Sequence, residues 1–302
     1  MEFSPTLALA GLVVGFMVGL TGMGGGALMT PILVLIFGID PVKAIGSDLV
    51  VSLIMKPFGA AVHHKAGTIR WEMIKWLVPF AIPAGFAGAF IIGHLGEGED
   101  LALRVKYAIG AALLLAVVGM IARPLVGEAH NKTKPMGKDE KLIPRPLPTA
   151  IVGVLGGLIV GMTSVGSGSL IIVCMMLIYP RLRASDLVGT DLFQAIPLVG
   201  AAALGHMLVG DVSFELTGAL LIGAIPGTYL GAKFSTKAPN AVLKWILSVL
   251  LLGSGLTLVG VDKTITFIAC VALAVTGMEM TAAKSKHALA QTYLKVTRLK
   301  FR

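Results

Sequence analysis

The stretch Thr21-Gly22-Met23-Gly24-Gly25-Gly26 lies inside an otherwise apolar run from Leu7 to Phe37. The run is long enough to enter a bilayer, but four of its glycines fall within five residues. Each glycine in a helix interior costs about 1 kcal/mol, so one continuous helix is not expected here. A break at membrane depth exposes backbone N–H and C=O groups, which are tolerated only where they face protein or a water-filled cavity. The sequence therefore predicts a broken helix with a binding site at the break.

The composition of the 302-residue chain indicates a polytopic helical membrane protein. Hydrophobic residues make up 56% of the chain, charged residues 14%, and the mean hydropathy is +0.88. Several apolar stretches approach the roughly 20 residues that cross about 30 Å of hydrocarbon. The net charge of +9 comes from Lys and Arg in a few loops and the C-terminal tail, which favours the positive-inside rule over nucleic-acid binding. Cys174 and Cys270 lie in apolar segments and are interpreted as packed thiols, so no metal site or cofactor is expected.

The second half of the chain repeats the first. The stretch Thr163-Ser164-Val165-Gly166-Ser167-Gly168-Ser169 takes the place of the first glycine stretch, again between two short apolar pieces. Asp191 stands 143 residues after Asp48, and the same offset relates His206 to His63. Chance similarity between apolar segments does not usually hold one offset through Asp and His positions. We therefore infer an internal duplication.

Loop charge orients the two halves relative to the membrane. The loop after His63 contains Lys65, Arg70 and Lys75, whereas the loop after His206 contains no Lys or Arg, so the two loops are expected on opposite sides. Charge parity then makes each broken helix a hairpin, with the N-terminus outside and the C-terminus in the cytoplasm. The predicted fold class is an all-α polytopic membrane protein with two inverted-topology repeats, each a broken-helix hairpin plus three transmembrane helices, and one extra C-terminal helix.

The predicted segments follow one another in a simple order. They are repeat 1 (5–123, with hairpin 7–37 and spans 41–63, 71–93 and 103–122), a cytoplasmic linker (124–148), repeat 2 (149–260, with hairpin 150–179 and spans 185–207, 214–235 and 241–259), an extra helix (264–283) and a basic cytoplasmic tail (284–302). Asp40 is the predicted N-cap of the span that starts at Pro41. The tail is interpreted as an inside anchor, and a role in binding a partner or lipid stays open.

The two breaks are the candidate substrate site. Inverted repeats with broken helices are the recurrent plan of secondary transporters, which bind substrate near the midplane. The short helices after the breaks would point their N-terminal N–H groups and positive dipole ends at this region, which favours an anion. The alternative is that the glycines only allow close helix packing. The candidate substrate-binding residues are Thr21, Gly24, Gly25, Gly26, Lys56, Thr163, Ser164, Gly166, Ser167, Gly168 and Ser169.

Carboxylates inside predicted spans are the candidate coupling groups. Asp48 and Asp191 lie about 10 Å into their spans by helix rise, and intramembrane carboxylates are costly and by default functional. Lys56 is a lone cation on the same helical face as Asp48, so it suits an anionic substrate or an ion pair with that carboxylate. A purely structural role of the two carboxylates also stays open. The coupling or proton-carrying candidates are Asp48, Asp191, His63 and His206, with Ser47, Ser52, Thr190 and Gln194 in support.

These residues resemble the sulfite exporter TauE/SafE family. The resemblance covers residues 7 to about 259 and depends on the break Gly24-Gly25-Gly26, its copy Gly166-Ser167-Gly168, and the motifs Gly46-Ser47-Asp48 and Gly189-Thr190-Asp191. It implies a multi-pass transporter of a bacterial-type inner (plasma) membrane that moves sulfite, sulfoacetate or related organosulfonates, coupled to protons. Many family members carry a small residue where the two Asp stand, and the segment after Val261 lies outside the family's eight-segment description.

We therefore expect a secondary transporter and not an enzyme. Its expected partners are a small anionic substrate, protons and membrane lipid, without nucleic acid, and a homodimer stays open. A passive anion channel is the first alternative, because the same cavity would support it. An intramembrane aspartyl protease also needs two Asp on neighbouring spans, but Ser47 and Thr190 stand where the Gly-x-Gly-Asp signature needs glycine.

Overall fold

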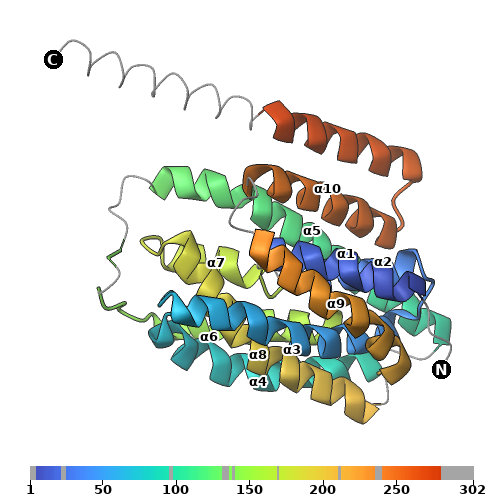
Figure 1. The fold of residues 1–302 in the computed structure, drawn as a ribbon, viewed down its shortest axis with the longest axis horizontal. Helices are drawn as coiled ribbons and strands as arrows, with labels where there is room; N and C mark the ends of the chain where they lie inside the picture. Colours follow the sequence, from blue (N-terminus) through green and yellow to red (C-terminus); the bar gives the residue numbers. More distant parts are fainter. Residues whose placement is uncertain are drawn as a thin grey trace.

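The structure is a computed structural model that describes residues 5–21, 25–94, 98–130, 136–137, 140–168, 170–209, 212–234 and 240–279. Its helices are α1 (Pro5–Thr21), α2 (Gly26–Leu35), α3 (Pro41–Lys65), α4 (Trp71–Gly93), α5 (Gly98–His130), α6 (Pro146–Thr163), α7 (Leu170–Ile178), α8 (Ala184–Val209), α9 (Phe214–Phe234), α10 (Asn240–Leu258) and a further helix over 263–279 (Figure 1).

Five helices of the described chain are long and apolar enough to cross a membrane. They are Pro41–Lys65, Trp71–Ile92, Gly98–Ile121, Pro146–Thr163 and Asp186–Val209, and shorter apolar helices cover Pro5–Leu20, Gly26–Leu35 and Trp245–Leu258. The predicted class, an all-α polytopic membrane protein, is therefore confirmed. The assignment of segments to inverted repeats stays a prediction.

Helix boundaries show where local sequence signals act. The carboxylate of Asp40 accepts hydrogen bonds from the N–H groups of Val42 (3.0 Å) and Lys43 (3.2 Å), so Asp40 caps α3 as predicted. Helix α5 ends at His130 and not near 122, so the first residues of the expected linker 124–148 are helical. Residues 124–130 are mostly apolar, and Leu125, Glu128 and Ala129 among them are good helix formers.

Helices α6 and α7 form a hairpin. The hydroxyl of Tyr179, the residue after α7, lies 2.7 Å from the hydroxyl of Thr149 and accepts a hydrogen bond from the N–H of Arg145 at 2.8 Å. Since Arg145 and Thr149 flank the first turn of α6, the end of α7 has returned to the start of α6. The chain therefore reverses direction between the two helices.

Glycines place two helix pairs in backbone contact. A Cβ atom on Gly15 of α1 would lie 2.9 Å from the Cα of Ala224 in α9, and one on Gly157 of α6 would lie 3.0 Å from the Cα of Ala81 in α4. Small residues allow such close approach between membrane helices. The two contacts occupy matching positions in the two halves, which agrees with the inferred duplication.

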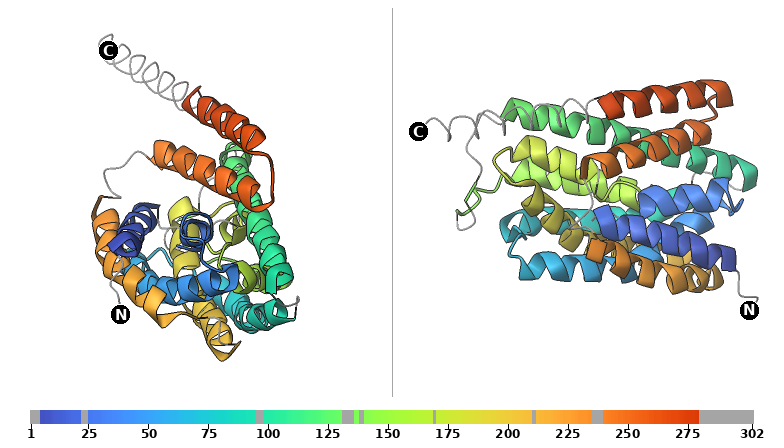
Figure 2. Two further views of the ribbon diagram at one scale, coloured as in Figure 1. Left: turned by 90° about the vertical axis from the view of Figure 1, so that its right-hand side faces the viewer. Right: turned by 45° about the horizontal axis from the view of Figure 1, so that its top comes forward.

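The two halves of the chain are interleaved. Helix α1 packs on α9, α6 on α4, α3 on α8 and α5 on α10, so every major pair joins one half to the other (Figures 1 and 2). The helix over 263–279 lies at the edge of the bundle beyond α10, where the Cys270 thiol is 3.8 Å from the Val249 carbonyl oxygen. Helices α3 and α8 are the two most buried of the five long apolar helices, and they position the residues described next.

Candidate functional site

The turn after α6 uses backbone conformations that suit glycine. Ser164 has a φ of 57°, Gly166 one of 127° and Gly168 one of 91°. Positive φ is uncommon outside glycine, which explains the glycine-rich composition of this turn. The Thr163 hydroxyl donates a hydrogen bond to the Ile159 carbonyl (2.6 Å) and accepts one from the N–H of Val165 (3.1 Å), so Thr163 stabilises the turn itself.

The two helix breaks lie in contact with each other. A Cβ atom on Gly26, the first residue of α2, would lie only 2.7 Å from the hydroxyl oxygen of Ser164 and would overlap its carbonyl group. Glycine at position 26 is therefore required by the close approach of the two chains. Two predicted site residues, Gly24 and Ser169, lie outside the described residues, and the side chain of Thr21 is also not described.

Three hydroxyl groups surround the carboxylate of Asp48, which is fully buried. Thr30 donates at 2.8 Å and Ser52 at 3.4 Å, and Ser164 adds a third hydrogen bond from the turn after α6. A Cβ atom on Gly25 would lie 3.6 Å from the same carboxylate. The Asp48 carboxylate therefore lies beside the N-terminus of α2, where the positive end of the helix dipole favours a negative charge.

Lys56 occupies the next part of the site. Its ammonium group donates a hydrogen bond of 2.7 Å to the hydroxyl of Ser167, and the residue is only 4% exposed. In the part of the chain that the structure describes, no carboxylate lies within ion-pair distance of Lys56. The charged groups that act on it from further away are Asp191, which has the larger effect, and Asp48.

A third group of polar atoms lies on α8. The amide nitrogen of Gln194 donates a hydrogen bond of 3.0 Å to the carboxylate of Asp191, and both residues are buried. We call the whole assembly the central polar cluster. It consists of Thr30, Asp48, Ser52, Lys56, Ser164, Ser167, Asp191 and Gln194. It holds two carboxylates and one ammonium group, supplied by helices from both halves of the chain.

Two predicted support residues lie outside this cluster. The hydroxyl of Thr190 accepts a hydrogen bond from the N–H of Arg70 at 2.9 Å, and that of Ser47 accepts one from the N–H of Ser213 at 3.2 Å. Each of these two residues directly precedes an Asp of the cluster, but consecutive side chains on a helix point about 100° apart. The hydroxyls therefore fasten loops to helices, while the neighbouring carboxylates enter the cluster.

The two histidines also lie elsewhere. His63 is half-buried near the end of α3, where its Nδ1 lies 2.9 Å from the hydroxyl of Thr68. His206 is fully buried on α8, and its Nε2 lies 2.9 Å from the carbonyl oxygen of Gly161 in α6. One ring nitrogen of each histidine thus lies at hydrogen-bond distance from a neighbouring segment, the loop after α3 for His63 and helix α6 for His206. Within the described residues, no group of three His, Cys, Asp or Glu side chains is arranged to hold a metal ion.

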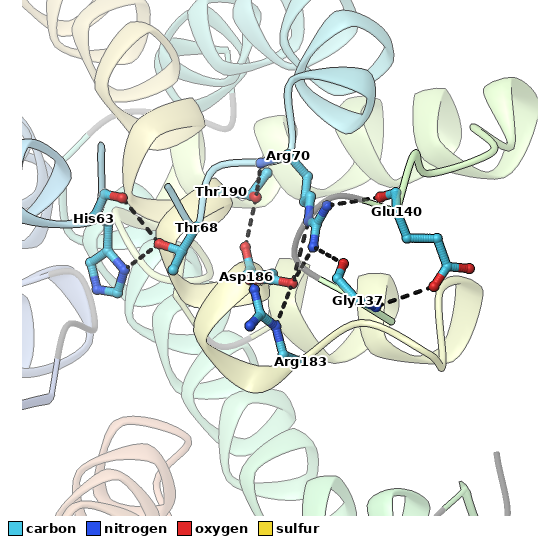
Figure 3. A network of polar contacts seen from close by, with 8 residues as sticks. All are labelled: His63, Thr68, Arg70, Gly137, Glu140, Arg183, Asp186 and Thr190. Carbon is cyan, nitrogen blue, oxygen red and sulfur yellow. Dashed lines mark hydrogen bonds and ion pairs between the residues drawn. The ribbon is translucent and has the colours of Figure 1, made fainter. Parts of the chain in front are cut away.

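A second polar assembly lies at the end of the bundle where α8 begins (Figure 3). Asp186, fully buried, pairs with the guanidinium groups of Arg70 (2.8 Å) and Arg183 (2.7 Å). Arg70 also donates to the carbonyl oxygens of Glu140 (3.2 Å) and Gly137 (3.3 Å). We call these five residues the Arg70–Asp186 network. It joins the α3–α4 loop, the chain between α5 and α6, and the first turn of α8.

The outer part of this network carries an exposed ion pair. Arg181 contacts the carboxylate of Glu140 at 2.7 Å, and both side chains are largely exposed. The backbone N–H of Gly137 and the Arg181 guanidinium hold the pKa of Glu140 below its ordinary value. In the sequence, Arg70 served only as a marker of loop charge. Thr30 was not predicted as a site residue, although it is the single hydroxyl residue in the apolar run 27–37.

The broken helices, interleaved halves and buried polar cluster define a membrane protein of the transporter type. The family model described as Sulfite exporter TauE/SafE matches residues 7–258. The chain therefore belongs to the sulfite exporter TauE/SafE family, as its motifs predicted. The helix over 263–279 lies beyond the matched region.

Relatives with curated descriptions have the same character. The probable membrane transporter protein YjnA of Bacillus subtilis (strain 168) is 37% identical over 263 residues, which cover 85% of this chain and all of that protein. The probable membrane transporter protein MJ0441 of Methanocaldococcus jannaschii is 28% identical over 259 residues, covering 82% of this chain and 92% of that protein. No solved structure matches the chain. The protein is therefore a multi-pass membrane transporter.

Proposed function

We propose that this protein is a secondary transporter that moves a small sulfur-containing anion by alternating access around the central polar cluster. The observation that carries the proposal is the ammonium group of Lys56, which is buried and bonded to Ser167 at the tip of the α6–α7 hairpin. A buried ammonium without a close carboxylate is costly, and a bound anion would offset that cost. An ammonium group has three N–H donors, and Ser167 accepts one of them.

The two helix breaks are not equivalent as anion sites. Asp48 lies beside Gly25 at the start of α2, so the protein's own carboxylate takes the position that an anion would favour there. At the second break, Ser167 lies three residues before Leu170, the first residue of α7, and holds the ammonium of Lys56. We therefore place the acidic group of the substrate at Lys56 and Ser167.

The nature of the anion is supported by the family. The description Sulfite exporter TauE/SafE supports sulfite, sulfoacetate or a related organosulfonate as substrate. Loop charge supports a bacterial-type inner (plasma) membrane with the N-terminus outside and the C-terminus in the cytoplasm. In this orientation the Arg70–Asp186 network lies on the cytoplasmic side.

Proton coupling follows from the charges of the cluster. With Asp48 and Asp191 ionised and Lys56 protonated, the cluster has a charge of −1 before the substrate enters. A bound monoanion would make the total charge of the cluster −2. This much negative charge is unfavourable in a buried site, so proton uptake by a carboxyl group accompanies anion binding. Acid on one side of the membrane should therefore drive the anion toward the other side.

Transport in liposomes tests this function. The purified full chain is reconstituted, and flux of sulfite and sulfoacetate is measured with and without an imposed pH gradient. We expect saturable flux that accumulates the anion against its own gradient, and a loss of about 100-fold or more in the Lys56→Met variant. Lys75→Met is the matched control, because Lys75 is exposed and should keep full flux. Flux that survives in Lys56→Met would remove the proposed site, and flux that never exceeds equilibrium would indicate a channel.

A further inference from the structure

Gln194 has a buried polar atom that lacks a partner. The residue is 0% exposed, and its side-chain oxygen Oε1 has no hydrogen-bond donor among the described residues. The assignment of the two amide atoms follows from the neighbour, because the Asp191 carboxylate accepts a hydrogen bond and therefore faces the NH₂ group. Buried acceptors without a donor are rare in native proteins, so we expect a bound ligand to supply the hydrogen-bond donor for this oxygen.

The sequence repeat does not explain this glutamine. Position 51, which is related to position 194 by the offset of 143, holds a fully buried Val51. An apolar side chain is thus sufficient for packing at the equivalent place in α3. Gln194 therefore adds a polar function on one side of an otherwise duplicated helix pair.

Gln194 lies in the same cluster as the proposed anion site. Its partner Asp191, like Asp48, acts electrostatically on the ammonium group of Lys56. Helices α3 and α8 are packed together here, because a Cβ atom on Gly59 would lie 3.5 Å from the Leu192 side chain and one on Gly200 would lie 3.4 Å from the Leu53 side chain. The cluster therefore offers two kinds of partner to a ligand, donors at Lys56 and an acceptor at Gln194.

We propose that Gln194 is a specificity residue that accepts a hydrogen bond from an O–H or N–H group of the transported anion. The proposal rests on the proposed function, since it assigns the acidic group of the same ligand to Lys56 and Ser167. The ligand class is a small organic acid that also carries a hydroxyl or amino group. An anion without a donor leaves the Gln194 oxygen unpaired in a buried site, which disfavours its binding.

Matched ligands test the proposal on the purified full chain. Binding of ethanesulfonate and 2-hydroxyethanesulfonate is measured by calorimetry, together with acetate and glycolate as a carboxylate pair. We expect each hydroxylated ligand to bind the unmodified protein about ten-fold or more tightly than its partner. In Gln194→Met the ratio should fall to about one, while ethanesulfonate affinity stays within about two-fold. Thr217→Val removes a buried hydroxyl from α9 and should leave every ratio unchanged.

The outcomes separate this proposal from the proposed function. Equal affinities for both members of each pair would overturn the role of Gln194, while binding of ethanesulfonate would still support the anion site. An equal loss for all ligands in Gln194→Met would also overturn it, because the residue would then only support Asp191. A hydroxyl preference among carboxylates without sulfonate binding would keep the role of Gln194 and refute a sulfur-containing substrate. Absence of binding in both series would overturn both proposals.

Discussion

The hydroxyl of Thr190 accepts a hydrogen bond of 2.9 Å from the backbone N–H of Arg70, and this bond has a counterpart elsewhere in the molecule. Ser47, which precedes Thr190 by 143 residues, accepts the N–H of Ser213, which follows Arg70 by the same 143 residues. Each bond fastens the loop after one central helix to the second turn of the other. In each bond one half of the chain supplies the loop N–H and the other half supplies the helix hydroxyl. The two bonds are therefore equivalent under the repeat, which supports the duplication inferred from sequence.

The two fastened ends differ in their ion pairs. Asp186 binds Arg70 and Arg183 at the α8 end, whereas the matching position at the α3 end holds Lys43, which is exposed. Replacing Arg70 by Ala leaves the buried Asp186 carboxylate with Arg183 alone. We expect the free energy of unfolding to fall by about 2–3 kcal/mol. The melting temperature of the purified protein in detergent measures the loss.

A nearby exposed ion pair provides the control for Arg70→Ala. Arg181 pairs with Glu140 at the surface, where solvent screens the attraction, so Arg181→Ala should cost about 1 kcal/mol or less. Equal losses in the two variants would contradict the structural importance of the buried pair. Added salt should weaken the Arg181 pair more than the Arg70 pair.

Contact between the two helix breaks leads to a second prediction. In Gly26→Ala the new methyl group would overlap the carbonyl of Ser164, so one break must move away from the other. We expect a loss of about 1–3 kcal/mol in unfolding free energy and weaker anion binding. Gly218→Ala in α9 is the control, because nothing lies within 4 Å of a Cβ there. Gly26→Ala with unchanged stability and binding would refute the contact.

Much of the fold was accessible from sequence because the strongest signals were local. Four glycines in five residues mark the break before Gly26, and Asp40 marks the start of α3. Helix α5 continues to His130, beyond the predicted span 103–122, and Leu125, Glu128 and Ala129 in this extension are good helix formers. The helix pairs that pack together were not predicted. A glycine such as Gly15 or Gly157 indicates close packing, but its sequence position does not indicate which helix packs against it.

The candidate site was predicted in part. Asp48, Ser52 and Lys56 share one face of α3, so helical periodicity was enough to group them. The hydrogen bond from Lys56 to Ser167 joins residues 111 positions apart, and no local pattern reports such a pair. Thr30 stands out locally as a hydroxyl in an apolar run, but its partner Asp48 depends on the approach of α2 to α3. Whether these residues bind substrate stays a prediction.

Thr30 offers a test of how the Asp48 carboxylate is held. The Thr30 hydroxyl donates at 2.8 Å, and Val has the same shape without the donor. In Thr30→Val the buried carboxylate loses one of its three hydroxyl partners, which should cost about 1–3 kcal/mol of unfolding free energy. Thr276→Val is the control, because Thr276 is exposed and bonds only its own helix. A difference below about 0.5 kcal/mol between the variants would show that Asp48 does not need this donor.

Unequal surroundings of the two carboxylates separate their expected roles in transport. The Asp48 carboxylate accepts hydrogen bonds from Thr30 of α2 and Ser52 of α3 and lies beside the start of α2, so we expect it to hold these two helices together. Asp191 is bonded to the Gln194 amide on α8 and acts electrostatically on Lys56, so we expect an anion bound at Lys56 to change the balance of charge at Asp191. Asp191→Asn should therefore abolish the dependence of liposome flux on the pH gradient. Asp48→Asn should lower the melting temperature but keep that dependence in the protein that still folds. The reverse pattern would assign coupling to Asp48, and gradient dependence in both variants would exclude a carboxylate of this cluster as the single proton carrier.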